Sequence, residues 1–119
     1  MLDFARTRPA LRDADLRQGD AMTLPYGDKV FALAVMPLVL FFVPEPARGV
    51  AEMARVVRPG GTVSAYSWDM DGGGFPYAVL RAELEQMGVR TPSAPSEEAS
   101  RQDVSRRLWE TAGLVDVQT

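Results

Sequence analysis

The longest uncharged, apolar stretch of the chain runs from Val30 to Val43. A strand covered by helices on both faces of a parallel sheet has this continuous pattern, because neither face meets water. Pro37 cannot donate a hydrogen bond to a neighbouring strand, so we expect the strand to end near Met36. Residues 38–43 are then expected to turn away as a short helical piece.

Apolar residues spaced three and four apart predict three helices. The first is expected to begin at Pro44-Glu45-Pro46, because a first turn tolerates proline. It is expected to end at Pro59-Gly60-Gly61, where glycine accepts a positive φ. The other two are predicted over residues 75–88 and 100–112, the last of them capped by Gly113.

Shorter segments complete the pattern along the chain. The predicted strands cover residues 15–19, 62–68 and 114–118, and an incomplete helix covers residues 2–11. Strands that alternate with helices predict an α/β fold with a parallel sheet and right-handed crossovers. We expect one partial domain over residues 1–119, with a mobile Pro- and Ser-rich linker at 91–99.

Composition narrows the chemistry that this chain can perform. Its 119 residues include neither Cys nor His, which leaves out disulfides, thiolate nucleophiles, histidine bases and the usual zinc ligands. A formal net charge of −3 gives no attraction to phosphate backbones or anionic lipid, so we expect neither nucleic acid nor a membrane as partner. The apolar stretch is too short to span a bilayer and no signal peptide is recognisable, so we expect a cytoplasmic protein.

Three segments resemble, in order and spacing, the small-molecule (type 11-like) class I S-adenosylmethionine-dependent methyltransferases. They are residues 19–36, which begin Gly-Asp-Ala-Met-Thr-Leu-Pro-Tyr, residues 44–61, which end Arg-Val-Val-Arg-Pro-Gly-Gly, and Ser67-Trp68-Asp69. The resemblance implies a partial doubly wound, Rossmann-like, mostly parallel sheet with flanking helices. It also implies S-adenosylmethionine as cofactor, bound where the carboxyl ends of the strands meet.

The resemblance assigns cofactor contacts to five residues. Asp20 would accept a hydrogen bond from the adenine amino group, the backbone N–H of Ala21 would meet a ring nitrogen, and Met22 would pack near the adenine. A carboxylate at a strand end is a chemically suitable acceptor for an amino group. Met36 and Pro37 would lie along the methionine part of the cofactor. Two other readings stay open: Asp20 as a turn residue and Met36 as a core residue.

Trp68 and Asp69 fall where members of this family often line the substrate pocket. Trp68 is alternatively a large apolar anchor at a strand end. Asp69 and Asp71 are close enough in sequence to pair as a metal or acid/base site, although loop acids are usually solvated. Residues 72–74 are three glycines between a strand and a helix, but the lysine and hydroxyl of a phosphate loop are missing, so a flexible loop or lid is expected.

The resemblance stops short of the family pattern at both ends, so a truncated sheet is expected. Met1 falls inside the helix after the family's second strand, beyond the glycine-rich cofactor loop, and Thr119 lies within the sixth strand. Ala32 stands where many relatives carry Asp. Without the first strands, the apolar faces and the backbone edge of residues 30–43 are expected to be exposed and to pair with a second copy, as a homodimer or another self-association.

Three functions remain open at this stage. The first is methyl transfer from S-adenosylmethionine to a small-molecule acceptor, which depends largely on positioning and needs no dedicated nucleophile. The second is a non-catalytic remnant of such an enzyme. The third is a protein-binding module that uses the exposed sheet edge. No catalytic residue and no metal ligand are predicted.

Overall fold

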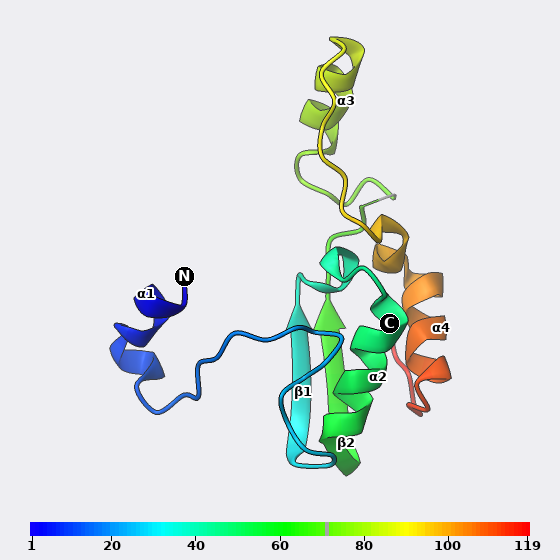
Figure 1. Ribbon diagram of the computed structural model, residues 1–119. Helices are drawn as coiled ribbons and strands as arrows, with labels where there is room; N and C mark the ends of the chain where they lie inside the picture. The colour runs from blue at the N-terminus through cyan, green and yellow to red at the C-terminus, as the bar shows by residue number, and fades with distance from the viewer. Residues whose placement is uncertain (71) are drawn as a thin grey trace.

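Two parallel strands and the helix that joins them form the centre of the molecule. In the computed structural model, which describes residues 1–70 and 72–119, strand β1 (Phe31–Pro37) leads through helix α2 (Pro46–Val56) to strand β2 (Val57–Tyr66). The described residues form a two-stranded parallel sheet, and α2 lies along it (Figure 1). This strand–helix–strand order confirms the predicted α/β fold class.

The sheet contains a bulge where the sequence predicted the end of a helix. The regular paired residues are Leu33–Thr62, Ala34–Val63, Val35–Ser64, Met36–Ala65 and Pro37–Tyr66. Helix α2 ends at Val56, so the prediction that residues 59–61 terminate it is wrong. These residues lie inside β2, where Gly60 has a φ of 77° and a Cβ on Gly61 would stand 2.6 Å from the carbonyl oxygen of Ala32. Gly60 therefore allows the positive φ of the bulge, and Gly61 allows the close approach of β1. Neither glycine caps a helix.

The hydrophobic core lies on the α2 side of the sheet. Its buried members are Met36, Leu40, Val43, Val50, Met53 and Ala99. The short 3₁₀ turns η2 (Leu40–Phe42) and η3 (Glu97–Ser100) meet there, because the hydroxyl of Ser96 donates to the carbonyl of Val43 over 2.9 Å. Helix α4 (Gln102–Thr111) closes this side by packing Leu108 and Trp109 against the core.

The other face of the sheet is exposed in the part of the chain that the structure describes. Strand β1 ends at Pro37 and is followed by the turn η2, which confirms the predicted end of the strand and the short helical piece after it. The continuous apolar pattern also predicted cover on both faces, yet Leu33 and Val35 are 54% and 51% exposed. Exposure of this face agrees with the expectation that β1 lacks neighbouring elements.

Two of the predicted strands do not form. Residues 15–19 and 114–118 have no ladder partner among the described residues, and near the first of them there is only an isolated bridge between Asp20 and Thr23. Asp116 has a φ of 56°, which interrupts an extended conformation. A strand needs a neighbour for its backbone hydrogen bonds, and here none lies alongside.

The remaining helices agree with the sequence pattern. Helix α1 (Leu2–Arg6) and the 3₁₀ turn η1 (Pro9–Leu11) form the interrupted N-terminal helix, and α3 (Ala78–Gln86) and α4 lie within their predicted ranges. Gly113 has a φ of 82° just after α4, as expected for a helix end. In Figure 1, α3 projects beyond the carboxyl ends of the strands and α1 lies away from the sheet. Among the described helices, none has the length and apolar character needed to traverse a bilayer.

Candidate functional site

A cavity of about 440 Å³ lies beyond the carboxyl ends of both strands. Leu38, the residue after β1, and Trp68, two residues after β2, both line it. The backbone N–H of Leu38 donates to the carbonyl of Tyr66 over 2.8 Å, which joins the two strand ends. Leu38 also has a φ of 55°, a conformation that is uncommon for a non-glycine residue and is often found at functional sites.

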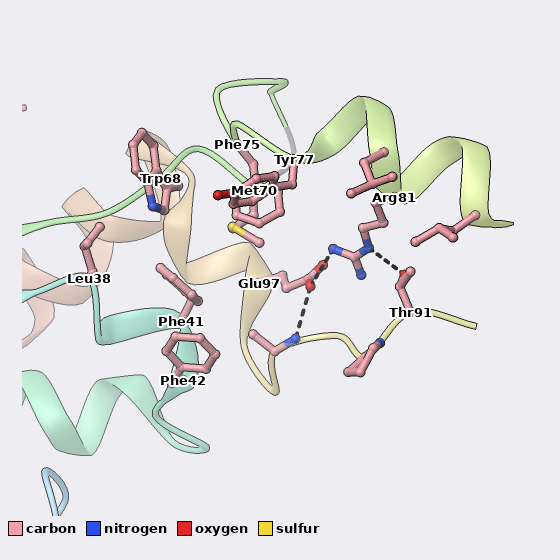
Figure 2. A pocket seen from close by; sticks show the side chains of 14 residues that line it. Leu38, Phe41, Phe42, Trp68, Met70, Phe75, Tyr77, Arg81, Thr91 and Glu97 are labelled. Atoms are coloured by element: carbon pink, nitrogen blue, oxygen red, sulfur yellow. Dashed lines mark hydrogen bonds and ion pairs between the residues drawn. The ribbon is translucent and has the colours of Figure 1, made fainter. Parts of the chain in front are cut away.

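Aromatic side chains form much of the cavity wall (Figure 2). They are Phe41, Phe42, Trp68, Phe75 and Tyr77. The rings of Phe41 and Phe42 have centroids 4.5 Å apart, and those of Phe75 and Tyr77 meet edge to face at 5.7 Å. The turn η2 supplies the first pair and the segment before α3 supplies the second. An apolar, concave site of this volume is typical of a small-molecule pocket.

Arg81 on α3 is the centre of the polar part of the wall. Its guanidinium pairs with the carboxylate of Glu97 over 3.0 Å and donates to the hydroxyls of Thr91 and Ser93 over 3.1 and 2.6 Å (Figure 2 shows the contacts with Glu97 and Thr91). The same oxygen of Glu97 accepts the backbone N–H of Ala94 over 3.1 Å. These contacts bind α3 to the segment 91–97 and pair Arg81 with Glu97, while Glu85, which is not a lining residue, lies 3.5 Å from the Nε of Arg81.

The predicted cofactor residues Asp20, Ala21 and Met22 form a turn. The side-chain Oδ1 of Asp20 accepts the backbone N–H of Met22 over 2.8 Å, and its carbonyl accepts the N–H of Thr23 over 3.1 Å. This is an Asx-type turn, which fits the alternative reading of Asp20 as a turn residue. The carboxylate is exposed, while Ala21 and Met22 are half-buried and pack against the core that includes Met36. The cofactor role of the turn stays a prediction.

The two predicted residues at the end of β1 have different surroundings. Met36 is 7% exposed and belongs to the core, which fits its alternative reading as a packing residue. Pro37 is exposed at the strand end. The structure therefore brings Ala21, Met22 and Met36 together through the core. Contact of Met36 and Pro37 with a cofactor stays a prediction.

Trp68 and Asp69 differ in their relation to the cavity. Trp68 is 42% exposed and lines the cavity. Asp69 is outside the lining, and its carboxylate accepts the N–H of Gly72 over 2.6 Å. The suggested partner Asp71 lies outside the described residues. Within residues 1–70 and 72–119, no group of three or more Asp, Glu, His or Cys is arranged to hold a metal ion.

Most of the cavity wall was missed from the sequence. Phe75 and Tyr77 carry a recognisable signal, because two aromatic residues follow directly on the three glycines. Arg81 and Glu97 carry none, since they are 16 positions apart, one in the predicted helix 75–88 and the other in the predicted linker 91–99. Only the tertiary structure brings them together.

Comparison with known proteins identifies the family. The sequence profile described as "Methyltransferase domain" matches residues 1–65, more than half of the chain. The chain belongs to the class I S-adenosylmethionine-dependent methyltransferase family. The predicted resemblance to that family is thereby confirmed, and the match includes the segments 19–36 and 44–61.

This chain matches only part of the length of its relatives in the family. The demethylmenaquinone methyltransferase of Desulfitobacterium hafniense (strain Y51) is 51% identical over 49 residues, which cover 41% of this chain and 19% of the relative. The phosphatidylethanolamine N-methyltransferase of Cereibacter sphaeroides is 49% identical over 49 residues, covering 41% and 24%. The demethylmenaquinone methyltransferase of Deinococcus radiodurans is 32% identical over 89 residues, covering 73% and 37%. The matched segments thus span well under half of each relative.

A solved structure supports the fold of this chain. A candidate methyltransferase from Bacillus halodurans C-125 superposes with a TM-score of 0.59 at 23% identity, over 86% of this chain and 46% of that protein. The agreement confirms the predicted Rossmann-like fold with a parallel sheet and flanking helices.

Proposed function

We propose that this chain carries an S-adenosylmethionine-binding edge and the acceptor pocket of a methyltransferase that acts on a small molecule. The observation that carries the proposal is the aromatic cavity at the carboxyl ends of β1 and β2. The turn at Asp20 packs, through Ala21 and Met22, against the hydrophobic core that includes Met36 of β1. Ligands of open α/β sheets bind at this edge. Membership of the methyltransferase family supports the cofactor.

The residues of the proposed cofactor edge suit an adenine ring chemically. The exposed carboxylate of Asp20 is an acceptor for an amino group, and half-buried Ala21 and Met22 offer an apolar surface next to it. When bound, S-adenosylmethionine supplies an electrophilic methyl group on a sulfonium. Asp20, Ala21 and Met22 would hold the adenine part of the cofactor, so that its methyl group would be available to an acceptor in the cavity. The residues that line the cavity would contribute by orienting the acceptor.

The names of two relatives indicate a demethylated menaquinone and phosphatidylethanolamine as acceptors of those proteins. For this chain we propose the coarser class, a small-molecule acceptor. A non-catalytic role as a module that self-associates is the competing proposal, motivated by the exposed face of β1. The cytoplasmic location stays a prediction.

Calorimetric titration with S-adenosylhomocysteine tests the cofactor edge. Asp20→Asn keeps an oxygen for the turn but removes the charge, and we expect about tenfold weaker binding, since a hydrogen bond to a charged group contributes about 1.5–3 kcal/mol. Asp13→Asn is the matched control, because Asp13 is also exposed and pairs only with its neighbour Arg12 over 3.2 Å in the described structure. Binding by the unaltered chain that is insensitive to Asp20→Asn would contradict this edge. No heat of binding at millimolar concentration would favour the non-catalytic alternative.

A further inference from the structure

We propose that the cavity selects an uncharged, flat aromatic molecule as its methyl acceptor. This inference rests on the proposed function and goes further by naming the class of acceptor. Three features of the wall carry it: the exposed aromatic rings, the arrangement of the two ring pairs, and the pairing of the charged groups with one another.

Three of the five aromatic side chains that line the cavity are exposed. Trp68 is 42% exposed, Phe42 59% and Tyr77 63%. Large apolar side chains that gather around one hollow while still in contact with water mark a binding site for an apolar partner. A volume of about 440 Å³ has room for a molecule of a few fused rings. The occupant is therefore a small apolar molecule.

The rings come from segments on different sides of the cavity. The Phe41–Phe42 pair belongs to η2 after β1, while Trp68 and the Phe75–Tyr77 pair follow β2 (Figure 2). Aromatic rings prefer offset-stacked or edge-to-face contacts with another ring. A flat aromatic ligand makes such contacts with both groups of rings, whereas an alkyl chain does not.

The charged groups that line the wall are already paired with partners on the protein. Each terminal nitrogen of Arg81, and its Nε, already has a partner within 3.1 Å, on Glu97, Ser93 or Thr91. An anion would have to compete with Glu97 for the guanidinium, and a cation would meet that guanidinium at the wall. Aromatic rings also attract cations. In this cavity, however, a bound cation would be repelled by the guanidinium of Arg81, which lines the same wall. Burial of an unpaired charge is costly, so a neutral ligand is favoured.

Three ligands with the same naphthalene ring test the proposal: 2-naphthamide is neutral, 2-naphthoate is an anion and 2-naphthylmethylammonium is a cation. In the Trp109→Phe chain, Trp68 is the remaining tryptophan, so its indole N–H signal in an NMR spectrum reports on the cavity directly. We expect 2-naphthamide to shift this signal and to bind about tenfold more tightly than either charged ligand, because of the cost of burying a charge. Calorimetry on the unaltered chain gives the same ranking without the substitution.

Matched variants locate the binding. Phe42→Ala removes a ring from the wall and is expected to weaken 2-naphthamide binding about tenfold, since the ligand loses an aromatic contact. Phe4→Ala is the control, because Phe4 is 67% exposed on α1 and lies outside the cavity lining. A charged ligand that binds as tightly as 2-naphthamide, no shift at millimolar ligand, or equal effects of the two variants would overturn the inference. Binding of 2-naphthamide by a chain that binds no S-adenosylhomocysteine would contradict the proposed function. It would still support the preference of the cavity for a neutral aromatic ligand.

Discussion

At the scale of single residues, Arg55 and Glu52 connect the loop after the Asp20 turn to α2. Glu52 accepts the backbone N–H of Leu24 over 2.7 Å and pairs with Arg55 over 2.6 Å. Arg55 also donates to the carbonyl of Tyr26 over 2.9 Å and to the carboxylate of Asp28 over 2.7 Å. The hydrogen bond from Arg55 lowers the pKa of Glu52, and the N–H of Leu24 acts in the same direction.

This lowered pKa gives stability a defined pH dependence. A glutamate with a lower pKa in the folded state stabilises the fold above its unfolded-state pKa of about 4.3, and that contribution is lost as pH falls further through the folded-state value. We therefore expect Glu52→Gln to reduce the free energy of unfolding by about 1 kcal/mol at pH 7 and by less as pH falls from about 4 to 3. Urea denaturation at pH 7, 5, 4 and 3 measures the difference.

The control for this experiment is Glu83→Gln, because Glu83 is exposed on α3. It is expected to change the unfolding free energy little at any of these pH values. A difference between the unaltered chain and Glu52→Gln that stays constant from pH 7 to 3 would contradict a role for the ionised carboxylate.

At the scale of elements, α3 depends on a single polar cluster for its position. The helix has nine residues and none of them is buried. A helix this short is marginal by itself in water, so tertiary contacts must stabilise it. The contacts of Arg81 with Thr91, Ser93 and Glu97 supply them and shape one wall of the cavity.

Removal of this cluster is therefore expected to loosen α3 without unfolding the core. In Arg81→Met, backbone amides of residues 78–86 and of Ala94 should exchange hydrogen at least about fivefold faster, because local opening rises as local contacts are lost. Arg107→Met on α4 is the matched control, since Arg107 is exposed and pairs with Asp103 over 3.4 Å at the surface. Hydrogen exchange with mass spectrometry gives both values. Equal protection of α3 in the two variants would show that other contacts hold it.

At the scale of the whole molecule, the chain is more extended than a compact domain of its length. Its radius of gyration is 16.5 Å. A compact chain of this length would have a radius of about 13.5 Å. The difference comes from α1 and α3, which extend away from the sheet, and one face of β1 stays in water (Figure 1). Parallel sheets are normally covered on both faces, so this face is a candidate for association.

Sedimentation equilibrium tests the self-association proposed for this face. We expect the apparent mass of the chain to rise with concentration, and Leu33→Lys to weaken that association about tenfold or more, because a charge in an apolar interface is costly. Val79→Lys is the control, since Val79 is 77% exposed on α3, away from the sheet. A stable monomer at every concentration would remove the homodimer proposal and would leave the methyltransferase family assignment unchanged.

The sequence alone determined those features that follow from the chemistry of neighbouring residues. Pro37 ends β1 because it lacks an N–H, and Pro46 begins α2 because a first turn needs none. The family resemblance of the segment around Asp20 could be recognised from the sequence because its residues are contiguous. The tertiary structure decided what depends on distant partners. Residues 15–19 and 114–118 have strand-like sequences but no neighbour to bond with, and Gly61 serves a close approach to Ala32. Arg81 and Glu97 meet only after the chain has folded back, which is why the cavity wall could not be predicted from the pattern.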